Sequence, residues 1–335
     1  MISISIVIPT YNSAKTLPAC LESIREQDYP VDKVEIIIAD AGSSDGTVEI
    51  ARRFTDKIYC NPLKTGEAGK AVGVRFARGE VVALIDSDNI LPERDWLMRM
   101  VAPFKYGDIA GTEPLYYTYR EEDGIITRYC ALMGMNDPLC LFMGNYDRMN
   151  QITGKWTEMP VNEEDMGDYF KVRLNGKKLP TIGANGFLVR RELLEKCSIE
   201  DYLFDIDVVY ELVMQGHDKF AKVKTGIVHI FSGSLSTFIR KQRRRIRDYG
   251  YYKKMGVRKY PWSALSKGKL LKFVVYTVAV FPLVGQSARG YMQKSDDAWV
   301  FHLVACWATL IVYGVGMIQN TIKAKEEDRS MWVQT

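Results

Sequence analysis

Two carboxylates follow an apolar run at a spacing that suits metal-assisted chemistry. Asp86 and Asp88, separated by Ser87, come directly after Val81 to Ile85, which is predicted to be a buried strand. Carboxylates spaced in this way can act together on one cation, and Mg²⁺ and Mn²⁺ prefer oxygen ligands that leave room for substrate phosphates. Such a cation neutralises charge on a leaving diphosphate. An acidic turn or a helix cap is the alternative interpretation of the same residues.

Two earlier turns also follow apolar runs. Asp40 comes after Val34 to Ala39, where a carboxylate can accept hydrogen bonds from a nucleobase. The glycines that follow permit a tight turn, and Asp45 suits the cap of the next helix. The first apolar run ends in a turn whose backbone and aromatic ring can line a nucleoside pocket. That turn is formed by Pro9, Thr10, Tyr11 and Asn12. Each segment alone is equally compatible with an ordinary turn.

Strand and helix signals alternate through the first hundred residues. The strand candidates are short, apolar and rich in β-branched residues, as central parallel strands are. They are Ile2 to Ile8, Val34 to Ala39, Lys57 to Cys60 and Val81 to Ile85. Amphipathic helices are predicted at Ala14 to Gln27, Thr47 to Phe54 and Ala68 to Ala77. This order predicts an α/β fold with a mostly parallel sheet, whose ligands bind at the carboxyl ends of the strands.

In this order the segments resemble glycosyltransferase family 2, whose members have the Rossmann-like GT-A fold. The resemblance is carried by Ile6 to Asn12, Ala39 to Thr47, Gly69 to Ala71, Ala77 to Glu80 and Asp86 to Asp88. It implies an inverting, hexosyltransferase-like enzyme that uses a nucleoside-diphosphate sugar and Mg²⁺ or Mn²⁺, with Asp88 as a direct metal ligand. It places these residues at the nucleotide-sugar: Pro9, Thr10, Tyr11, Asn12, Asp40, Lys70, Asp86 and Ser87. Ala41 stands where the family often has a second Asp, which leaves the choice of base open.

Later segments extend the resemblance to the acceptor and the base. The family usually has Glu-Asp where this chain has Phe204 and Asp205, so the assignment of the catalytic base rests on Asp205, with Asp207 as the second candidate. Inverting displacement needs one carboxylate to take the proton of the acceptor hydroxyl. Either residue also suits the N-cap of a helix. His229, after a predicted strand Thr225 to Val228, is a candidate further metal ligand, although a lone His is more often structural.

The acceptor or phosphate side is predicted from two motifs. The first is the loop Gly183-Ala184-Asn185-Gly186, which looks like the family's loop near the acceptor sugar. Gln242 and Arg245 belong to the second, which resembles the Gln-x-x-Arg-Trp motif of processive members, with Ile246 in place of Trp. The missing Trp weakens any expectation of polymer synthesis. The full set is Gly183, Asn185, Gly186, Asp207, Gln242 and Arg245.

The C-terminal part predicts a membrane attachment. Leu270 to Gln286 and Ala298 to Ile318 are apolar runs, and about 20 residues are needed to span a bilayer. A strongly basic segment precedes them, which favours anionic lipids and a cytoplasmic position. We therefore predict a glycosyltransferase domain at 1–238, a basic juxtamembrane segment at 239–269, two transmembrane or re-entrant helices at 270–320 and a cytoplasmic tail at 321–335. A buried helical hairpin in a soluble core is the alternative.

Bulk composition narrows the class of protein. The 335 residues are 47% hydrophobic and 26% charged, which allows a sizeable core, and the net charge of +4 is too small to indicate nucleic-acid binding. The six cysteines form no CxxC pair, so a structural zinc site is not expected. The predicted partners are a nucleoside-diphosphate sugar, a lipid-linked or membrane-proximal acceptor and membrane lipids. The alternatives are a soluble acceptor, or a non-catalytic nucleotide-sugar-binding scaffold. Residues 111 to 178 are expected to hold small helices over a cleft.

Overall fold

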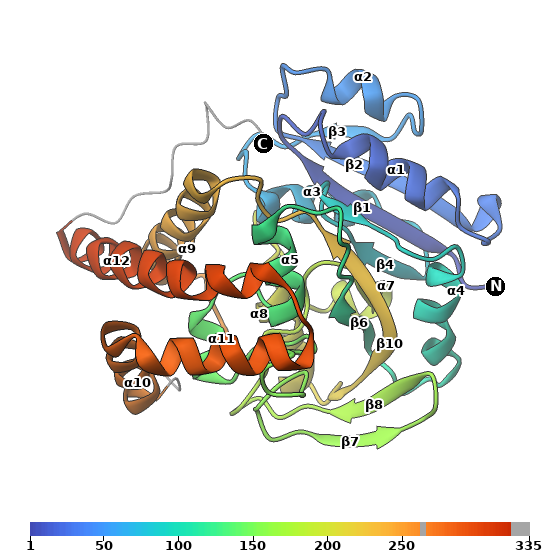
Figure 1. The fold of residues 1–335 in the computed structure, drawn as a ribbon. Coiled ribbons are helices and arrows are strands. Elements are labelled where there is room, and N and C mark those ends of the chain that lie inside the picture. Colours follow the sequence, from blue (N-terminus) through green and yellow to red (C-terminus); the bar gives the residue numbers. More distant parts are fainter. Residues whose placement is uncertain (262–265, 323–335) are drawn as a thin grey trace. The chain divides into compact units, whose positions relative to one another are not determined.

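The computed structural model describes residues 1–261 and 266–322, which form two compact units (Figure 1). The first, called the sheet unit here, contains Met1–Thr118 and Pro160–His229. The second, called the helical unit, contains Tyr119–Met159 and the described residues from Ile230 onward. Tyr119–Met159 therefore groups with the C-terminal helices, whereas the predicted domain 1–238 had included it. Most of the predicted tail 321–335 lies outside the described residues.

A mixed sheet of ten strands forms the core of the sheet unit as far as it is described. Its strands are β1 (Ile4–Thr10), β2 (Val34–Asp40), β3 (Ile58–Cys60), β4 (Val81–Leu84), β5 (Asn89–Ile90), β6 (Gly111–Tyr117), β7 (Asn162–Asp165), β8 (Tyr169–Arg173), β9 (Phe187–Arg190) and β10 (Lys219–His229). They lie in the order β3-β2-β1-β4-β9-β6-β10-β8-β7, and β5 pairs with the end of β10. The strands predicted in the first hundred residues thus form the part of the sheet from β3 to β4, and the predicted strand at Thr225 to Val228 lies within β10.

Strand directions decide where polar side chains can meet. The strands β1 to β4 are parallel to one another, as the apolar runs predicted. The strand β9 runs antiparallel between β4 and β6, and β10 is parallel to β6. The carboxyl ends of β1, β2, β4, β6 and β10 and the start of β9 therefore lie along one edge of the sheet. The predicted site residues of the sheet unit stand mainly at this edge.

Short helices cover the sheet. They are α1 (Leu17–Arg25), α2 (Thr47–Ala51), α3 (Gly66–Phe76), α4 (Trp96–Val101), α7 (Arg191–Leu194) and α8 (Asp205–Met214). The helix α3 lies close against β1, because a Cβ atom on Gly69 would lie 2.7 Å from Cβ of Pro9 and one on Gly73 would lie 2.3 Å from Cγ1 of Val7. This close approach brings Lys70, between the two glycines, to the edge where β1 ends.

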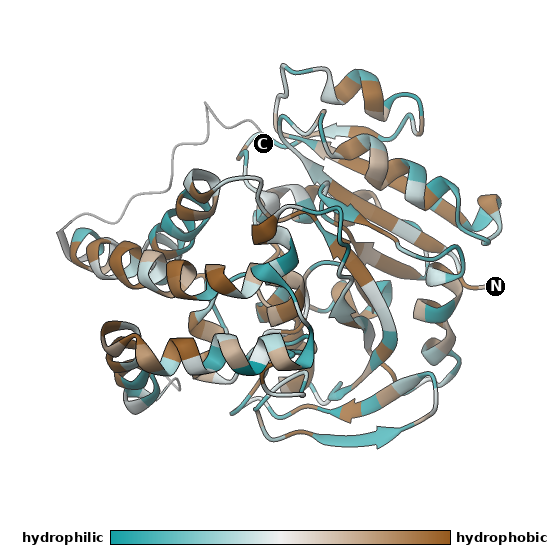
Figure 2. Ribbon diagram, viewed as in Figure 1, coloured by the Kyte–Doolittle hydropathy of each residue, from teal (hydrophilic) through white to brown (hydrophobic). Residues whose placement is uncertain are grey.

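The helical unit packs around aromatic side chains. Its helices are α5 (Ile125–Met133), α6 (Leu139–Met143), α9 (Leu235–Met255), α10 (Lys267–Ala279), α11 (Phe281–Gln293) and α12 (Phe301–Ile322). Tyr129, Phe142, Phe273 and Trp299 are buried in one cluster that α5, α6 and the last three helices share. Figure 2 shows long apolar stretches on α10 and α12. These stretches correspond to the two apolar runs of the sequence.

The two apolar runs differ in their helical structure. Within the described residues, Asp297–Asn320 is the one helix long and apolar enough to cross a membrane by itself. The first run is broken into α10 and α11, which meet at an angle of 92°, and it qualifies only if the bent pair is counted as one span. Within the described residues the structure therefore offers one candidate span by length and composition, or two if the bent pair is counted, for the two transmembrane or re-entrant helices that the sequence predicted.

Candidate active site

Four segments bring polar side chains to the carboxyl edge of the sheet. Thr10 and Asp40 end β1 and β2 opposite one another, and Asp86 to Asp88 follow β4. His229 ends β10, where it pairs in register with Asn89 of β5. Because these ends share one edge, the acidic residues predicted from separate motifs lie along it, and Asp88 comes within 3.5 Å of the imidazole of His229.

The carboxylate of Asp40 organises the turn that follows it. Its Oδ1 accepts hydrogen bonds from the hydroxyls of Thr10 at 2.8 Å and Ser43 at 2.6 Å. Its Oδ2 accepts from the backbone N–H groups of Gly42 at 2.9 Å and Ser43 at 2.8 Å. A carboxylate has about four lone-pair positions, so these donors occupy the positions at which Asp40 can accept hydrogen bonds. In this geometry Asp40 shapes the loop, and its predicted contact with a base stays a prediction.

The turns after β1, β2 and β4 are joined to one another. The backbone of Asn12 has a φ of 48°, in the left-handed region that Asn tolerates. Its N–H donates to Oγ of Ser43 at 2.8 Å, and its Oδ1 accepts from the N–H of Ser44 at 3.0 Å. The hydroxyl of Ser87 donates to that of Ser13 at 3.0 Å. Pro9 and Tyr11 lie half-buried in the same region.

One buried lysine connects two carboxylates of the site. The Nζ atom of Lys70 lies 2.8 Å from Oδ2 of Asp205 and 3.3 Å from Oδ1 of Asp86. Lys70 comes from α3, and Asp205 is the first residue of α8. The N–H of Leu203 donates to the carbonyl of Glu67 at 2.9 Å, which holds the segment before α8 against the start of α3. The contact joins residues that lie 135 positions apart in the sequence.

Burial and neighbouring charges shift the pKa values of Asp205 and Lys70. Burial raises the pKa of Asp205 to about 6, helped by repulsion from Asp86 and opposed by the Lys70 ammonium. Burial opposes the charge of Lys70 as well, but attraction from Asp205 and Asp86 outweighs it and raises the pKa of the lysine. Two carboxylates share one ammonium group, so one negative charge is left in excess. This excess negative charge favours the protonated form of a carboxyl group, which agrees with the raised pKa of Asp205.

The second oxygen of Asp205 has no donor in the described part of the chain. Its Oδ1 is buried and makes no hydrogen bond there. Gly183 packs against the backbone of the same residue, since a Cβ atom on this glycine would lie 2.6 Å from the carbonyl oxygen of Asp205. Its φ of 132° also favours glycine. An incoming hydroxyl group would satisfy the oxygen that lacks a donor.

Asp88 and His229 form a second pair of side chains. Oδ1 of Asp88 lies 3.5 Å from Nε2 of His229, and both side chains are mostly buried. The ring of Tyr117 lies beside the imidazole, with 5.5 Å between ring centroids. Among the described residues, no group of three or more His, Cys, Asp or Glu side chains converges on one point. The pair therefore supplies two candidate ligands.

The loop before β9 is tied to the same edge. Asn185, with a φ of 48°, donates through Nδ2 to the hydroxyl of Tyr117 at 3.0 Å and accepts from Nδ2 of Asn89 at 3.2 Å. The N–H of Gly186 donates to the carbonyl of Leu84 at 3.0 Å. The predicted acceptor-side loop is thereby placed next to the segment that carries Asp86 and Asp88.

Residues 5–197 match the profile of the family described as glycosyl transferase family 2, which is more than half of the chain. The chain belongs to this family. The fold agrees: the mannosyltransferase PcManGT from Pyrobaculum calidifontis, solved with GDP-Man and Mn²⁺, superposes with a TM-score of 0.52 at 18% identity. The match covers 93% of this chain and 87% of that one. This protein thus has the GT-A fold of that family.

Curated relatives match a shorter stretch. The glycosyltransferase AglE of Haloferax volcanii is 35% identical over 105 residues, or 30% of this chain and 34% of the relative. A dolichyl N-acetyl-alpha-D-glucosaminyl phosphate 3-beta-D-2,3-diacetamido-2,3-dideoxy-beta-D-glucuronosyltransferase of Methanococcus voltae is 32% identical over 109 residues, again 30% of this chain and 34% of the relative. The matches span about a third of the length of these two relatives.

A buried ion pair that was not predicted supports the site of this glycosyltransferase. Glu113 of β6 and Lys222 of β10 pair in register, and their charged groups lie 2.6 Å apart with almost no exposure. The other oxygen of Glu113 accepts the N–H of Gly183 at 2.8 Å. A charged residue within each of two apolar strands was the signal in the sequence that could have indicated this ion pair. Which two residues pair, however, depends on the order of the strands in the sheet. Asn89 and Tyr117 were missed for the same reason.

Three predicted residues lie outside this cluster of contacts. Asp207 is buried in the first turn of α8. Gln242 and Arg245 belong to the helical unit, where each donates to the carbonyl of Asn136, at 2.8 Å and 3.1 Å. In that unit they hold the connection between α5 and α6 against α9.

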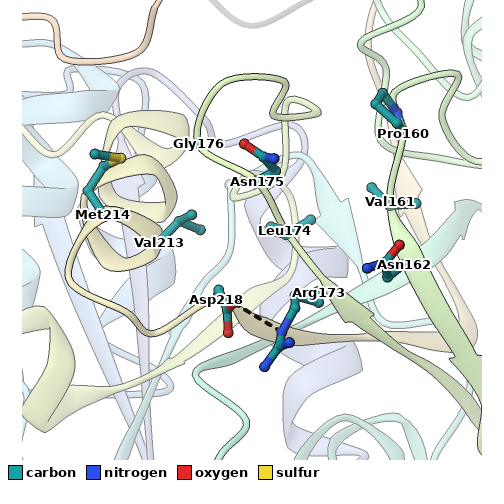
Figure 3. A pocket seen from close by; sticks show the side chains of 10 residues that line it. All are labelled: Pro160, Val161, Asn162, Arg173, Leu174, Asn175, Gly176, Val213, Met214 and Asp218. Carbon is teal, nitrogen blue, oxygen red and sulfur yellow. Dashed lines mark ion pairs between the residues drawn. The ribbon is translucent and has the colours of Figure 1, made fainter.

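A separate pocket lies at the opposite end of α8 from Asp205 (Figure 3). It is open, has a volume of about 550 Å³ and is lined by residues such as Asn162, Asn175 and Met214. Arg173 and Asp218 form an ion pair of 3.1 Å at its wall. Because Asp205 and Met214 stand at the two ends of α8, about 14 Å of helix separates them. The pocket is therefore distinct from the carboxyl edge.

Proposed function

We propose that this glycosyltransferase transfers a sugar from a nucleoside-diphosphate sugar to a hydroxyl group of a lipid-linked or membrane-proximal acceptor, with inversion at the anomeric carbon. The observation that supports this most directly is the position of Asp205 beside Lys70 and Asp86. It puts a carboxylate of raised pKa at the same edge as the pair Asp88 and His229.

Asp205 acts as the general base in this proposal. A carboxyl group with a pKa of about 6 is ionised at neutral pH and accepts a proton more readily than an ordinary aspartate. Its Oδ1 takes the proton of the acceptor hydroxyl. The oxygen of that hydroxyl attacks the anomeric carbon, and the nucleoside diphosphate leaves from the opposite side. Attack from one face and departure from the other invert the configuration. Asp207 stays the second candidate for this role.

Asp88 and His229 would hold Mg²⁺ or Mn²⁺. Their oxygen and nitrogen donors lie 3.5 Å apart, which suits two ligands of one ion, and two protein ligands leave positions for diphosphate oxygens. When bound, the ion supplies positive charge that stabilises the leaving diphosphate. Lys70 contributes a fixed positive charge nearby through its contact with Asp86.

The nucleoside would lie against the turns after β1 and β2. Tyr11 is half-buried there, and Thr10 and Asp40 keep the turn after β2 in shape through the hydrogen bond of 2.8 Å. Asp86, Ser87 and Asn12 complete the donor side. On the acceptor side we assign Gly183, Asn185 and Gly186, and we assign Gln242 and Arg245 to positioning of the acceptor phosphate.

A membrane-proximal acceptor is supported by two observations. The helical unit contains an apolar helix long enough to cross a bilayer. A relative of 32% identity carries a dolichyl phosphate acceptor in its name. The basic segment before the apolar runs favours the cytoplasmic face of the membrane. The sugar, the base and the acceptor are open.

The test is a donor screen of the purified chain with Mn²⁺ or Mg²⁺, scored by release of nucleoside diphosphate. We expect the native chain to turn over one donor, and Asp205→Asn to lower turnover by about 10²- to 10⁴-fold while the donor still binds. Asp201→Asn, an exposed aspartate just before α8, is the matched control. Native turnover by Asp205→Asn would exclude this residue as the base. Donor binding without turnover under every condition would favour a nucleotide-sugar-binding scaffold.

A further inference from the structure

The connection between the two apolar segments is tied to the start of the helical unit. Asp296 accepts hydrogen bonds from the hydroxyl of Tyr119 and from Nη1 of Arg128, the latter at 3.0 Å. The other guanidinium nitrogen of Arg128 lies 2.6 Å from Oδ1 of Asp297. Arg128 belongs to α5. The carboxylates between α11 and α12 are thus engaged by residues from an earlier part of the chain.

Chain connectivity limits how far this connection can lie from the sheet unit. Tyr119 comes two residues after Tyr117, the last residue of β6. Two residues reach at most about 7 Å, whereas the hydrocarbon core of a bilayer is about 30 Å thick. The connection between α11 and α12 must therefore lie on the same side of a membrane as the sheet unit. Two spans would place it on the opposite side.

The first apolar segment is also held at its start. Nζ of Lys269, near the beginning of α10, donates to the carbonyl of Met143 at the end of α6 at 2.8 Å. Phe142 of α6 packs edge-on against Phe273 of α10 with 5.1 Å between ring centroids. The helices α10 and α11 have 13 residues each, about 20 Å of helix, and they bend by 92° at Val280. A segment bent in this way forms no straight span of about 30 Å.

The helix α12 runs along α9. The hydroxyl of Tyr313 lies 3.1 Å from Oε1 of Gln242, and Nδ2 of Asn320 donates to the carbonyl of Ile246 at 2.8 Å. Between them Gly316 lets the two backbones approach, since a Cβ atom there would lie 2.4 Å from Cγ2 of Ile246. The last two turns of α12 therefore lie beside the middle of α9.

The charge of α9 opposes burial in hydrocarbon. It carries one acidic residue, Asp248, against eight basic ones. The basic residues are Arg240, Lys241, Arg243, Arg244, Arg245, Arg247, Lys253 and Lys254. Charged side chains are strongly disfavoured at the centre of a bilayer but are attracted to anionic headgroups. A helix that packs along α9 stays near the headgroups with it.

The opposite face of α12 is apolar and exposed. Its exposed side chains recur every three or four residues, which places them on one face. Among them are Val304, Trp307, Ile311, Val315 and Ile318. Leu271, Val278 and Phe281 of α10 and α11 are exposed as well. This pattern is typical of helices that lie in the membrane interface, with one face in the acyl region.

We propose that the helical unit lies in one leaflet of an anionic membrane and that none of α9 to α12 crosses the bilayer. The inference rests on the membrane-proximal acceptor of the proposed function. In place of two transmembrane helices, it attaches the helical unit to one side of the membrane. Lipid is the occupant that the charges favour, because a second copy docking through this face would bring the same basic helix with it. The acceptor would then be reached from within the leaflet that holds the unit.

Sidedness is tested by cysteine labelling with a membrane-impermeant maleimide on sealed vesicles of both orientations. Cys60 is exposed on the sheet unit and marks its side. The second marker is Ser295→Cys, at an exposed position between α11 and α12, introduced into a chain that also carries Cys60→Ser. Labelling of the chain with Cys60→Ser alone measures the background from the other cysteines and is subtracted. We expect both cysteines to react from the same side. Reaction from opposite sides would overturn the inference. Asp205→Asn must label in the same way, so the result does not depend on turnover.

Lipid contact is tested by vesicle flotation. Phe281→Glu, at 86% exposure, should lower binding to phosphatidylcholine–phosphatidylglycerol vesicles about tenfold or more. Val31→Glu, at 87% exposure in the sheet unit, should leave binding unchanged. The inference would be overturned if Phe281→Glu bound vesicles as well as the native chain does. It would also be overturned if the native chain formed a dimer in detergent and Phe281→Glu lost this dimer but kept vesicle binding. If Phe281→Glu fails to fold, the labelling result decides.

Discussion

Lys70 lies between two carboxylates, and its single charge has to serve both. Its contact with Asp205 is shorter than its contact with Asp86, at 2.8 Å and 3.3 Å. Burial of the group makes each lost contact expensive, since a buried charge without a partner is strongly disfavoured. A donor diphosphate that approaches Lys70 would compete with Asp86 for the ammonium. At the residue scale, donor binding and the state of the base are therefore coupled through one side chain.

The raised pKa of Asp205 predicts the pH dependence of turnover. Below a pKa of about 6 the carboxyl group is protonated and cannot accept the acceptor proton, so turnover should rise as pH increases through about 6 and then level off. Lys70→Met removes the ammonium that favours the ionised form, and the rise should shift to higher pH by about one unit or more. The measurement is turnover at saturating donor from pH 5 to 9. A profile that is flat across this range would contradict the prediction.

The pair Asp88 and His229 predicts metal-dependent donor binding. Asp88→Ala removes an oxygen ligand, and we expect the affinity for the donor in Mn²⁺ to fall by about 10-fold or more, to the value measured with a chelator. Calorimetric titration of the donor with and without Mn²⁺ provides the measurement. Asp95→Ala, which changes an exposed aspartate at the N-cap of α4, is the control. Unchanged affinity of Asp88→Ala in Mn²⁺ would exclude the metal role.

At the scale of elements, the strands β6 and β10 support the site through Glu113 and Lys222. Lys222→Met leaves Glu113 as a buried charge without its partner and should lower the free energy of unfolding by about 3 to 5 kcal/mol. The double variant Glu113→Gln with Lys222→Met should recover part of this loss, because the glutamine still accepts the N–H of Gly183. Urea unfolding followed by circular dichroism measures both. Equal stability of the native chain and Lys222→Met would contradict a supporting role.

The elements that the sequence predicted are those with a clear apolar pattern. The runs at Val34 and Val81 became β2 and β4 with boundaries shifted by a residue or less. The strand β7 was not predicted, because Asn162–Asp165 is exposed along its whole length and has no apolar side. The strand β6 contains Glu113 and Pro114, which interrupt the apolar run. A pattern method fails where a strand is stabilised by its neighbours more than by its own burial.

The candidate site was predictable as separate residues but not as contacts. Family resemblance pointed to Lys70 and Asp205, yet nothing local in the sequence predicts an ion pair across 135 positions. Asp40 was predicted from its place after a strand, whereas its hydrogen bonds depend on the turn and on Thr10 of another strand. Long-range pairs follow from sheet order, which the first hundred residues determine only in part.

At the scale of the whole molecule, the helical unit depends on its C-terminal helices. Phe142 packs against Phe273, and Tyr129 packs against Phe301 with 5.3 Å between ring centroids. Deletion from Leu270 onward would expose these aromatic side chains of α5 and α6 to water. We expect the truncated chain to leave the membrane fraction but to aggregate, as measured by size-exclusion chromatography with light scattering. A monodisperse truncated chain would show that α5 and α6 fold without α10 to α12.

The acidic strand β7 determines how the sheet ends. It is the last strand in the order beyond β8, and its residues Glu163, Glu164 and Asp165 are exposed. A free edge strand presents unpaired backbone groups that can recruit a strand from another chain, and this is a common route to aggregation. Two such edges approaching each other would bring Glu163 and Glu164 of both strands close together, whereas Asp165 is paired with Lys224 at 2.6 Å. Self-repulsion at this rim should keep the protein dispersed at the high local concentrations that the proposed membrane attachment would produce.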